Sequence, residues 1–219
     1  MKKIMLFALL ISVAGASAIA QGGYRGSQRS SGNGAIEGAK PGDFQFYLLT
    51  LSWSPEFCRQ NPSTPECASH PRFLLHGLWP ENGDGSYPAD CSQQPGLRNW
   101  SAYKDLYPDE GLMQHEWSKH GTCSALSADA YFTAARNAVH SITIPPVLAG
   151  GDIPSQMIPS EILKDFAQAN PGVPPGAFRR SCAANRLSAV TVCVSKDLKP
   201  ISCQGVRTCG ATSVKITPP

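Results

Sequence analysis

Two short segments hold most of the side chains that could carry out chemistry. Residues 73–80 read FLLHGLWP and residues 115–123 read HEWSKHGTC, and together they contain three of the chain's five histidines. An imidazole can be half protonated at mild pH, so two histidines can serve as general base and general acid in one reaction. With the carboxylate and the lysine of the second segment beside them, they suit cleavage of a phosphate ester by an internal nucleophile, without a metal ion.

The second segment is expected to form a helix that gathers its ionisable side chains on one side. At about 100° per residue, four of them fall within an arc of about 140°: His115, Glu116, Lys119 and His120. Cys123 lies within the same arc, whereas Trp117 points away from it, toward the core. A solvated helix face is the ordinary explanation of one charged pair, but four such groups so close together favour a reactive surface.

The first segment supplies His76. A strand is predicted from Arg72 to His76, and Gly77 is expected to end it. A lone histidine at a strand end is more often structural than catalytic. If this strand packs face to face with the helix, however, His76 lies across a small cleft from His120.

The elements around these segments predict an α+β fold. Residues 44–52 have the apolar, aromatic character of a buried central strand, and 187–195 alternates as another, with 201–203 returning beside it. Helices are expected in two pieces over 98–123, from an N-cap at Ser127 to about Ser141, and from Ser160 to 170–172. Because regular βαβ alternation is absent, we expect a single domain with a central, mostly antiparallel sheet packed against several helices and stabilised by disulfides.

The N-terminal region is expected to direct export. Residues 1–20 read as a signal peptide, with Lys2 and Lys3 before an apolar run that is too short to span a bilayer. Residues 21–42 read as a flexible Gly/Ser-rich leader, and 43–219 as the catalytic domain. The protein is therefore expected to be periplasmic or secreted, with no membrane association after signal removal.

Eight cysteines follow the signal peptide. An even number in an exported chain predicts four disulfides, although eight cysteines allow 105 pairings and the residues alone do not select one. Zinc is the competing use of these side chains, but the chain has no tight Cys-x-x-Cys pair.

The overall charge gives little indication of a nucleic-acid partner. The formal net charge is +3, of which Lys2 and Lys3 contribute two, so about +1 remains after cleavage. A protein that grips long nucleic acid mainly by counterion release is usually far more basic. Any contact with nucleic acid must therefore rest on a local cluster of residues.

The two segments resemble the two active-site blocks of the ribonuclease T2 family. Residues 51–55 (LSWSP) and 194–203 (VSKDLKPISC) also match the family pattern, and the similarity covers about residues 44–209. The resemblance implies an endoribonuclease that cleaves single-stranded RNA with low base specificity. It implies metal-independent transesterification through a 2′,3′-cyclic phosphate, with no cofactor.

The resemblance also implies a role for each reactive residue. His120 is expected to act as general base on the ribose 2′-hydroxyl, and His76 as general acid on the departing 5′-oxygen. Glu116 and Lys119 are expected to stabilise charge on the phosphorane, and His115 to hold the phosphate. A substrate without the 2′-hydroxyl lacks the nucleophile, so DNA should not be cleaved.

Further expectations follow from the resemblance. Trp79 is implied as a base-stacking platform, with core packing as an equally weighted alternative, and the protein is expected to be a monomer that binds its RNA substrate. Four disulfides are implied: Cys58–Cys67, Cys91–Cys123, Cys182–Cys209 and Cys193–Cys203.

Two other functions would use parts of the same pattern. A zinc hydrolase of the His-Glu-x-x-His type needs a second histidine at position 119, where this chain has Lys119. A catalytically inactive RNA-binding or recognition protein on the same scaffold would normally have lost a catalytic histidine, whereas His76 and His120 are both present.

Overall fold

The computed structural model describes residues 34–69 and 72–219. The signal-peptide prediction for residues 1–20 and most of the predicted leader lie outside the described residues. The last part of that leader contains a short strand, β1 (Ala35–Glu37), which pairs in parallel with β4 (Tyr87–Ala89). The end of the segment predicted as a leader therefore contacts the domain through backbone pairing, which its Gly-rich composition gives no means of predicting.

A six-stranded sheet forms the centre of the molecule, with the strand order β3-β2-β7-β8-β5 and β6 beside β7. The pairs β2–β3, β2–β7, β6–β7 and β5–β8 are antiparallel, and β7–β8 is parallel. The strands are β2 (Phe46–Trp53), β3 (Phe73–Glu81), β5 (Gln156–Met157), β6 (Phe178–Ala183), β7 (Arg186–Val194) and β8 (Val214–Lys215). The prediction of a mostly antiparallel sheet in an α+β domain is confirmed.

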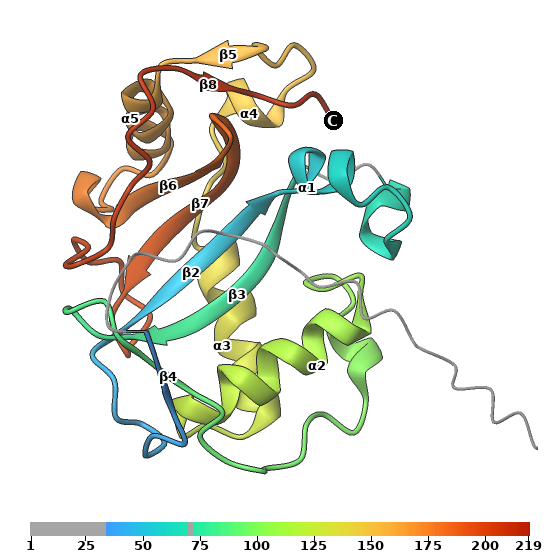
Figure 1. Ribbon diagram of the computed structural model, residues 1–219, viewed down its shortest axis with the longest axis vertical. Coiled ribbons are helices and arrows are strands. Elements are labelled where there is room, and N and C mark those ends of the chain that lie inside the picture. Colours follow the sequence, from blue (N-terminus) through green and yellow to red (C-terminus); the bar gives the residue numbers. More distant parts are fainter. Residues whose placement is uncertain (1–33, 70–71) are drawn as a thin grey trace, which may run out of the picture.

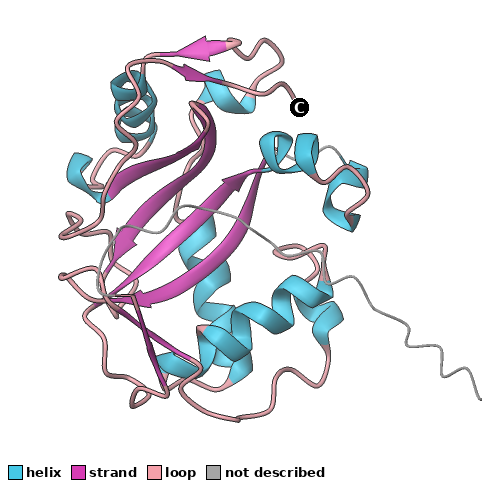
Figure 2. Cartoon of the chain, in the orientation of Figure 1, coloured by secondary structure: helices cyan, strands magenta, loops and turns pink. Residues whose placement is uncertain are grey.

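Helices cover the sheet and its ends (Figures 1 and 2). The α-helices are α1 (Ser54–Gln60), α2 (Glu110–Lys119), α3 (Ala128–His140), α4 (Pro146–Ala149) and α5 (Pro159–Ala169). Short 3₁₀ turns are η1 (Pro65–Ser69), η2 (Trp100–Tyr103), η3 (Gly121–Ser124) and η4 (Pro175–Ala177). As predicted, Ser127 caps α3, its hydroxyl accepting a hydrogen bond from the Ala130 N–H. Among the described residues, none of the helices has the length and apolar character needed to cross a membrane.

The central strand β2 is buried on both faces. Leu49, Leu51 and Trp53 on one face belong to the main core, which α3 completes with residues such as Phe132. On the other face, Leu48 packs in a smaller cluster that includes Trp79 and Cys193. Burial of apolar side chains on both sides of one strand holds the sheet and α3 in a defined relation, so residues carried by β2 and β3 have little freedom to move.

The structure corrects the prediction for the strand that carries His76. Instead of ending at Gly77, β3 continues to Glu81 and pairs with β2 along its length, with an irregular register near its middle. A glycine breaks a strand only when no neighbour holds it, and here the fully buried β2 provides the pairing. The sequence pattern could not supply this information.

Several elements lie outside the sequence predictions. β6 and α1 were not predicted, and residues 201–203 do not form a strand, although the Ile201 N–H donates to the Cys193 carbonyl at 2.9 Å. The first of the two helical pieces expected over 98–123 is only the 3₁₀ turn η2. These differences concern the periphery of the sheet and leave its central strands as predicted.

Candidate active site

His76 occupies a β-bulge in β3. Thr50 of β2 lies opposite Gly77, and the next residue, Leu51, lies opposite Leu75. His76 is therefore the extra residue between two regular pairs. A bulge of this kind redirects the side chain that it carries and is common beside active sites. The His76 side chain is directed into the structure and is only 7 % exposed.

Both ring nitrogens of His76 have a protein group nearby. The Nδ1 atom lies 3.2 Å from the hydroxyl oxygen of Ser52 on the adjacent strand β2. The Nε2 atom lies 3.8 Å from Oε1 of Glu116 on α2, within ion-pair distance when the imidazole is protonated. The strand and the helix thus meet at this side chain, which is the packing that a shared site for His76 and His120 needs.

The indole of Trp79 connects the groups of the site. Its Nε1–H donates a hydrogen bond of 2.6 Å to Oε2 of Glu116. The ring centroid lies 5.0 Å from that of His76 and 5.4 Å from that of His120. The two imidazole centroids cannot be farther apart than those two distances together, so the histidines, 44 positions apart in the chain, share one locality.

Gly77 makes this arrangement sterically possible. A Cβ atom at this position would overlap Trp79 Nε1 and Oε2 of Glu116, the two atoms of the hydrogen bond just described. Gly77 does not end the strand; its missing side chain leaves space in which the indole and the carboxylate meet. The glycine after His76 is the sequence signal for this close approach, although by pattern alone a glycine there predicts a strand break.

Glu116 lies on helix α2, and His120 comes directly after the last residue of that helix. Asp109 caps its first turn by accepting hydrogen bonds from two backbone N–H groups, and the helix ends at Lys119. His120 follows immediately, and its backbone N–H still bonds to the Glu116 carbonyl at 3.1 Å. Glu116 and His120 are 1 % and 2 % exposed, respectively. The Tyr87 ring lies 6.3 Å from the His120 ring.

The other ionisable residues of the second segment have more contact with solvent. His115 is exposed and Lys119 is half-buried, whereas Glu116 and His120 are buried. The predicted helix face therefore divides into a buried pair and a more accessible pair. Trp117 lies in the core, as predicted, and its Nε1–H donates to the Gln94 carbonyl at 3.1 Å.

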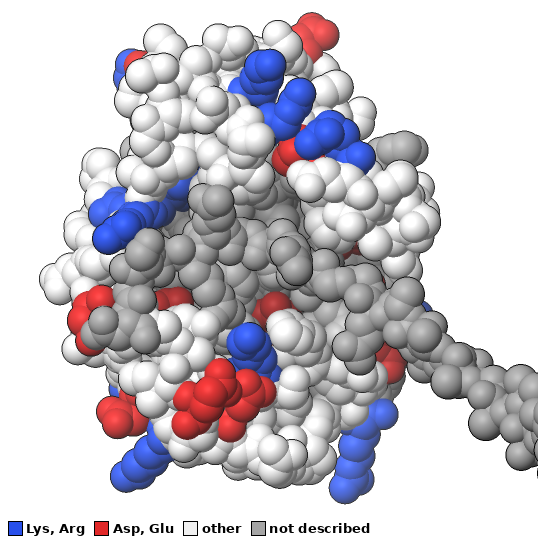
Figure 3. Space-filling model, in the orientation of Figure 1, with Lys and Arg blue, Asp and Glu red and all other residues white. Residues whose placement is uncertain are grey.

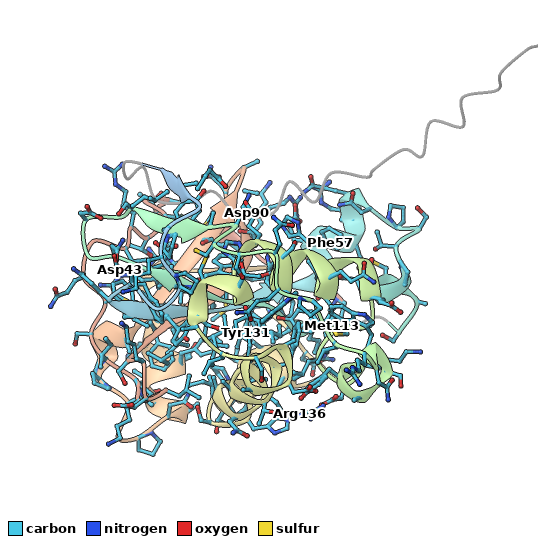
Figure 4. All side chains as sticks on the ribbon, turned by 90° about the horizontal axis from the view of Figure 1, so that it is seen from below. Asp43, Phe57, Asp90, Met113, Tyr131 and Arg136 are labelled. Atoms are coloured by element: carbon cyan, nitrogen blue, oxygen red, sulfur yellow. A yellow bond between two sulfur atoms is a disulfide. The ribbon has the colours of Figure 1, made fainter. Side chains whose placement is uncertain are left out.

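The helix α3 supports the site from behind. Tyr131 of α3, labelled in Figure 4, donates a hydrogen bond of 2.9 Å from its hydroxyl to the Leu78 carbonyl of β3. Burial, followed by the nearby charge of Glu116, raises the pKa of Tyr131 well above its ordinary value. The hydroxyl therefore stays a hydrogen-bond donor, linking α3 to the strand between His76 and Trp79.

Four disulfides form the covalent frame, and they are the pairs that the resemblance implies: Cys58–Cys67, Cys91–Cys123, Cys182–Cys209 and Cys193–Cys203. The Cys91–Cys123 bond joins the segment after β4 to η3, directly after α2. Beside it, the Asp90 N–H donates to the Lys119 carbonyl at 2.9 Å. The disulfide and this hydrogen bond thus fix the C-terminal end of α2, directly before His120.

The donor side chains near one another bear on whether a metal ion could bind. Among the described residues, one group of three donor side chains could surround an ion: Cys58, Glu66 and Cys67. Both cysteines are joined in a disulfide, so neither offers a thiolate. This group gives no support to a metal site, and it does not include the residues that we call the histidine site: His76, Trp79, Glu116 and His120.

Comparison with solved structures defines the class of fold. RNase MC1 from the seeds of bitter gourd aligns with a TM-score of 0.60 at 24 % identity, covering 78 % of this chain and 100 % of that one. Trichomaglin, described as an S-like ribonuclease, aligns with a TM-score of 0.65 at 20 % identity, covering 80 % and 98 %. The chain therefore has the α+β fold of these ribonucleases.

Comparison of sequences then identifies the family. Ribonuclease DdI of Dictyostelium discoideum is 32 % identical over 202 residues, covering 77 % of this chain and 86 % of that protein. A ribonuclease of Aeromonas hydrophila is 43 % identical over 90 residues, a match that spans 39 % of this chain and only 40 % of that protein. The family model described as "Ribonuclease T2 family" matches residues 44–203. The chain belongs to the ribonuclease T2 family.

Proposed function

We propose that the protein is an endoribonuclease that cleaves single-stranded RNA by transesterification, without a metal ion and with low base specificity. The observation that carries this proposal is the contact of two buried imidazoles, His76 and His120, with one indole. Family membership supports ribonuclease activity, and the histidine pair supports acid–base chemistry as its means.

In the proposed reaction, the ribose 2′-oxygen attacks the adjacent phosphorus. His120 takes the proton of the 2′-hydroxyl, and His76 gives a proton to the 5′-oxygen as its bond to phosphorus breaks. The products are a 2′,3′-cyclic phosphate and a free 5′-hydroxyl, with no net change in protons. Water opens the cyclic phosphate in a second step, in which the two imidazoles exchange roles. Each proton transfer typically contributes about 10²–10⁴-fold to the rate.

The remaining residues are proposed to stabilise charge and hold the substrate. Glu116 and Lys119 stabilise the phosphorane, and the accessible His115 holds the phosphate; a positioned stabiliser is worth about 10²–10³-fold. Trp79 was expected to stack on a base. Its burial and its bond to Glu116 favour orienting that carboxylate, which leaves only a small part of the ring for stacking.

The distribution of charge on the surface fits an RNA substrate that binds at one site and not along an extended basic surface. On the face in Figure 3, the described Lys and Arg side chains lie in separate groups, with Asp and Glu side chains among them. Single-stranded RNA that enters one site needs no long basic band. We propose a monomer that binds RNA, leaves DNA uncleaved and makes no use of a cofactor.

We also propose that the protein acts outside the cytoplasm, in the periplasm or after secretion. The N-terminal signal pattern and the four disulfides support this location, because disulfides persist in oxidising compartments. Relatives with intracellular and with extracellular names both exist: tomato has proteins named intracellular ribonuclease LX and extracellular ribonuclease LE.

The decisive experiment is a digest of homopolymeric and mixed RNA by the purified protein in excess EDTA, with the product ends identified. We expect cleavage with terminal 2′,3′-cyclic phosphates and 5′-hydroxyls from all four homopolymers. A matched oligonucleotide with one 2′-deoxy linkage should be spared at that linkage. Loss of cleavage in EDTA, or products with 5′-phosphates, would contradict the mechanism. No cleavage by the folded protein would favour the inactive RNA-binding alternative.

A further inference from the structure

We propose that Ser52 is the positioning residue of His76. Its hydroxyl oxygen accepts a hydrogen bond from Nδ1–H of the imidazole and thereby reserves Nε2 as the nitrogen that exchanges protons. This inference rests on the proposed function, since it assigns the tautomer with which His76 acts as an acid.

The contact between the two side chains is buried and specific. Ser52 Oγ and His76 Nδ1 are 3.2 Å apart, and the two residues are 8 % and 7 % exposed. The register pairs Ser52 with Leu74, so the bulged His76 reaches it diagonally across the strand pair. With so little exposure, water has little access to replace the hydroxyl as the partner of Nδ1.

The opposite nitrogen faces the reactive side of the site. Nε2 lies 3.8 Å from Glu116 Oε1, and Oε2 of the same carboxylate accepts the indole N–H of Trp79. The ring thus has a hydroxyl at one nitrogen and the catalytic carboxylate at the other. These two contacts set the plane of the imidazole as well as the identity of the nitrogen that faces the substrate.

Proton counting shows why an acceptor at Nδ1 matters. An imidazolium has N–H groups at both nitrogens, whereas a neutral imidazole keeps only one. If Nδ1–H bonds to Ser52 Oγ in both states, the proton given to the leaving 5′-oxygen comes from Nε2, and the same bond persists after the transfer. A hydrogen bond at one ring nitrogen is the ordinary means by which proteins select a histidine tautomer.

A second buried hydroxyl pair provides a matched control. The hydroxyls of Thr50 and Thr191 lie 3.3 Å apart between β2 and β7. This pair joins the same central strand to its other neighbour, and a Thr191→Val substitution removes one hydroxyl without changing the shape of the side chain. It reproduces the loss of a buried hydrogen bond in the sheet while leaving the Ser52–His76 contact intact.

The experiment measures the tautomer directly, without RNA. Histidine ¹⁵N shifts of the wild type should show neutral His76 as the Nδ1–H form. Ser52→Ala should give a mixture of the two forms, Ser52→Thr should restore the wild-type form, and Thr191→Val should leave it unchanged. Ser52→Val, which has the shape of the threonine variant without its hydroxyl, replaces Ser52→Ala if the alanine variant does not fold.

Kinetics provide the second readout. Loss of one hydrogen bond of about 0.5–1.5 kcal/mol predicts a fall in kcat of about 2- to 12-fold for Ser52→Ala, with KM unchanged and kcat recovered in Ser52→Thr. An unchanged tautomer in Ser52→Ala overturns this inference, as does an equal fall in kcat for Thr191→Val. Failure of the proposed function has a different signature, because the wild type itself would then not cleave RNA.

Discussion

At the scale of single residues, the site is organised around one aromatic ring. Trp79 contacts both imidazoles and donates its N–H to Glu116, so three groups from two distant segments depend on its position. A rigid ring loses little conformational freedom on burial, and its N–H orients the carboxylate without adding a charge. The indole therefore acts as a common packing surface for the two imidazoles and as the hydrogen-bond donor that holds the carboxylate.

Replacing His120 tests the proposed base. His120→Phe retains a ring to pack against Trp79 but has no nitrogen to accept the 2′-hydroxyl proton, so RNA cleavage should fall about 10²–10⁴-fold. His140→Phe, at the end of α3, serves as the control and should retain full activity. Initial rates on a fluorogenic oligonucleotide measure both variants. Wild-type turnover by His120→Phe would eliminate the two-histidine scheme.

Gly77 provides a steric test. Gly77→Ala places a methyl group where Trp79 and Glu116 meet, which we expect to cost about 1–3 kcal/mol in the free energy of unfolding and to lower the cleavage rate. Gly151→Ala is the matched control, because nothing lies within 4 Å of a Cβ at that position. Urea denaturation and the fluorogenic assay give both quantities. Equal stability of the two variants would mean that the close contact is not required.

Much of the residue-level site was available from the sequence. The spacing of His115, Glu116, Lys119 and His120 predicts their common side of one helix, and the structure places that helix beside the strand of His76. The division into buried and accessible pairs could not be predicted, because burial depends on what packs against the helix. The sequence pattern also could not predict the hydrogen bond between Trp79 and Glu116, because the two residues are 37 positions apart in the chain.

At the scale of elements, the bulge in β3 explains why strand prediction failed there. Periodicity records the local alternation of side chains, whereas a bulge depends on the register that a partner strand imposes. The fully buried β2 imposes that register over Phe73–Glu81. Long periodic segments such as α3 and β7 were predicted to within one or two residues, because their patterns are local.

The disulfide at the end of α2 is expected to matter for activity as well as stability. Cys91 and Cys123 are 32 residues apart, and opening a loop of that size should cost about 3–4 kcal/mol. The double serine variant should also cleave RNA more slowly, because η3 and the end of α2 lose their covalent tie beside His120. Thermal unfolding and initial rates at a temperature where the variant stays folded measure the two effects.

The Cys58–Cys67 bond provides the comparison for this prediction. Its two cysteines are 9 residues apart, and it ties α1 to η1, outside the contacts of the histidine site. The double serine variant of this pair should be destabilised less, by about 2–3 kcal/mol, and should keep its activity while folded. Equal losses of activity in the two double variants would show that neither bond acts specifically on the site.

At the scale of the whole molecule, the C-terminal end of the chain lies near α1 (Figure 1), and a buried carboxylate of that helix bonds to it. Glu56 of α1 is 2 % exposed and accepts hydrogen bonds from Arg59, Gln60 and the Thr217 hydroxyl. Burial raises its pKa, but the hydrogen bonds from these partners and the charge of Arg59 outweigh that effect, so the pKa lies below its ordinary value of 4.5.

This network predicts an acid-sensitive contribution to stability. Because the pKa of Glu56 is lower in the folded state than in the unfolded state, its contribution is present above the unfolded value and is lost as the pH falls through the folded value. The free energy of unfolding of the wild type should therefore fall more steeply below pH 4.5 than that of Glu56→Gln.

The control for this prediction is Glu161→Gln, which changes an exposed carboxylate paired with Lys164 on α5. Exposed pairs of this kind contribute about 0–1 kcal/mol, so this variant should follow the wild type at every pH. Urea denaturation of all three proteins across the acid range measures the difference. Parallel curves for the wild type and Glu56→Gln would show that the buried network does not set the acid response.

If the protein is exported as proposed, the bond between Cys91 and Cys123 also bears on where the proposed enzyme becomes fully active. Thiols in the cytosol are kept reduced, so under the proposed export a copy still in the cytosol would lack this bond beside His120. Such a copy would be less hazardous to the ribosomes and messages of the cell that made it. Oxidation after export would then complete the catalyst, so that maturation and self-protection depend on the same pair of sulfur atoms.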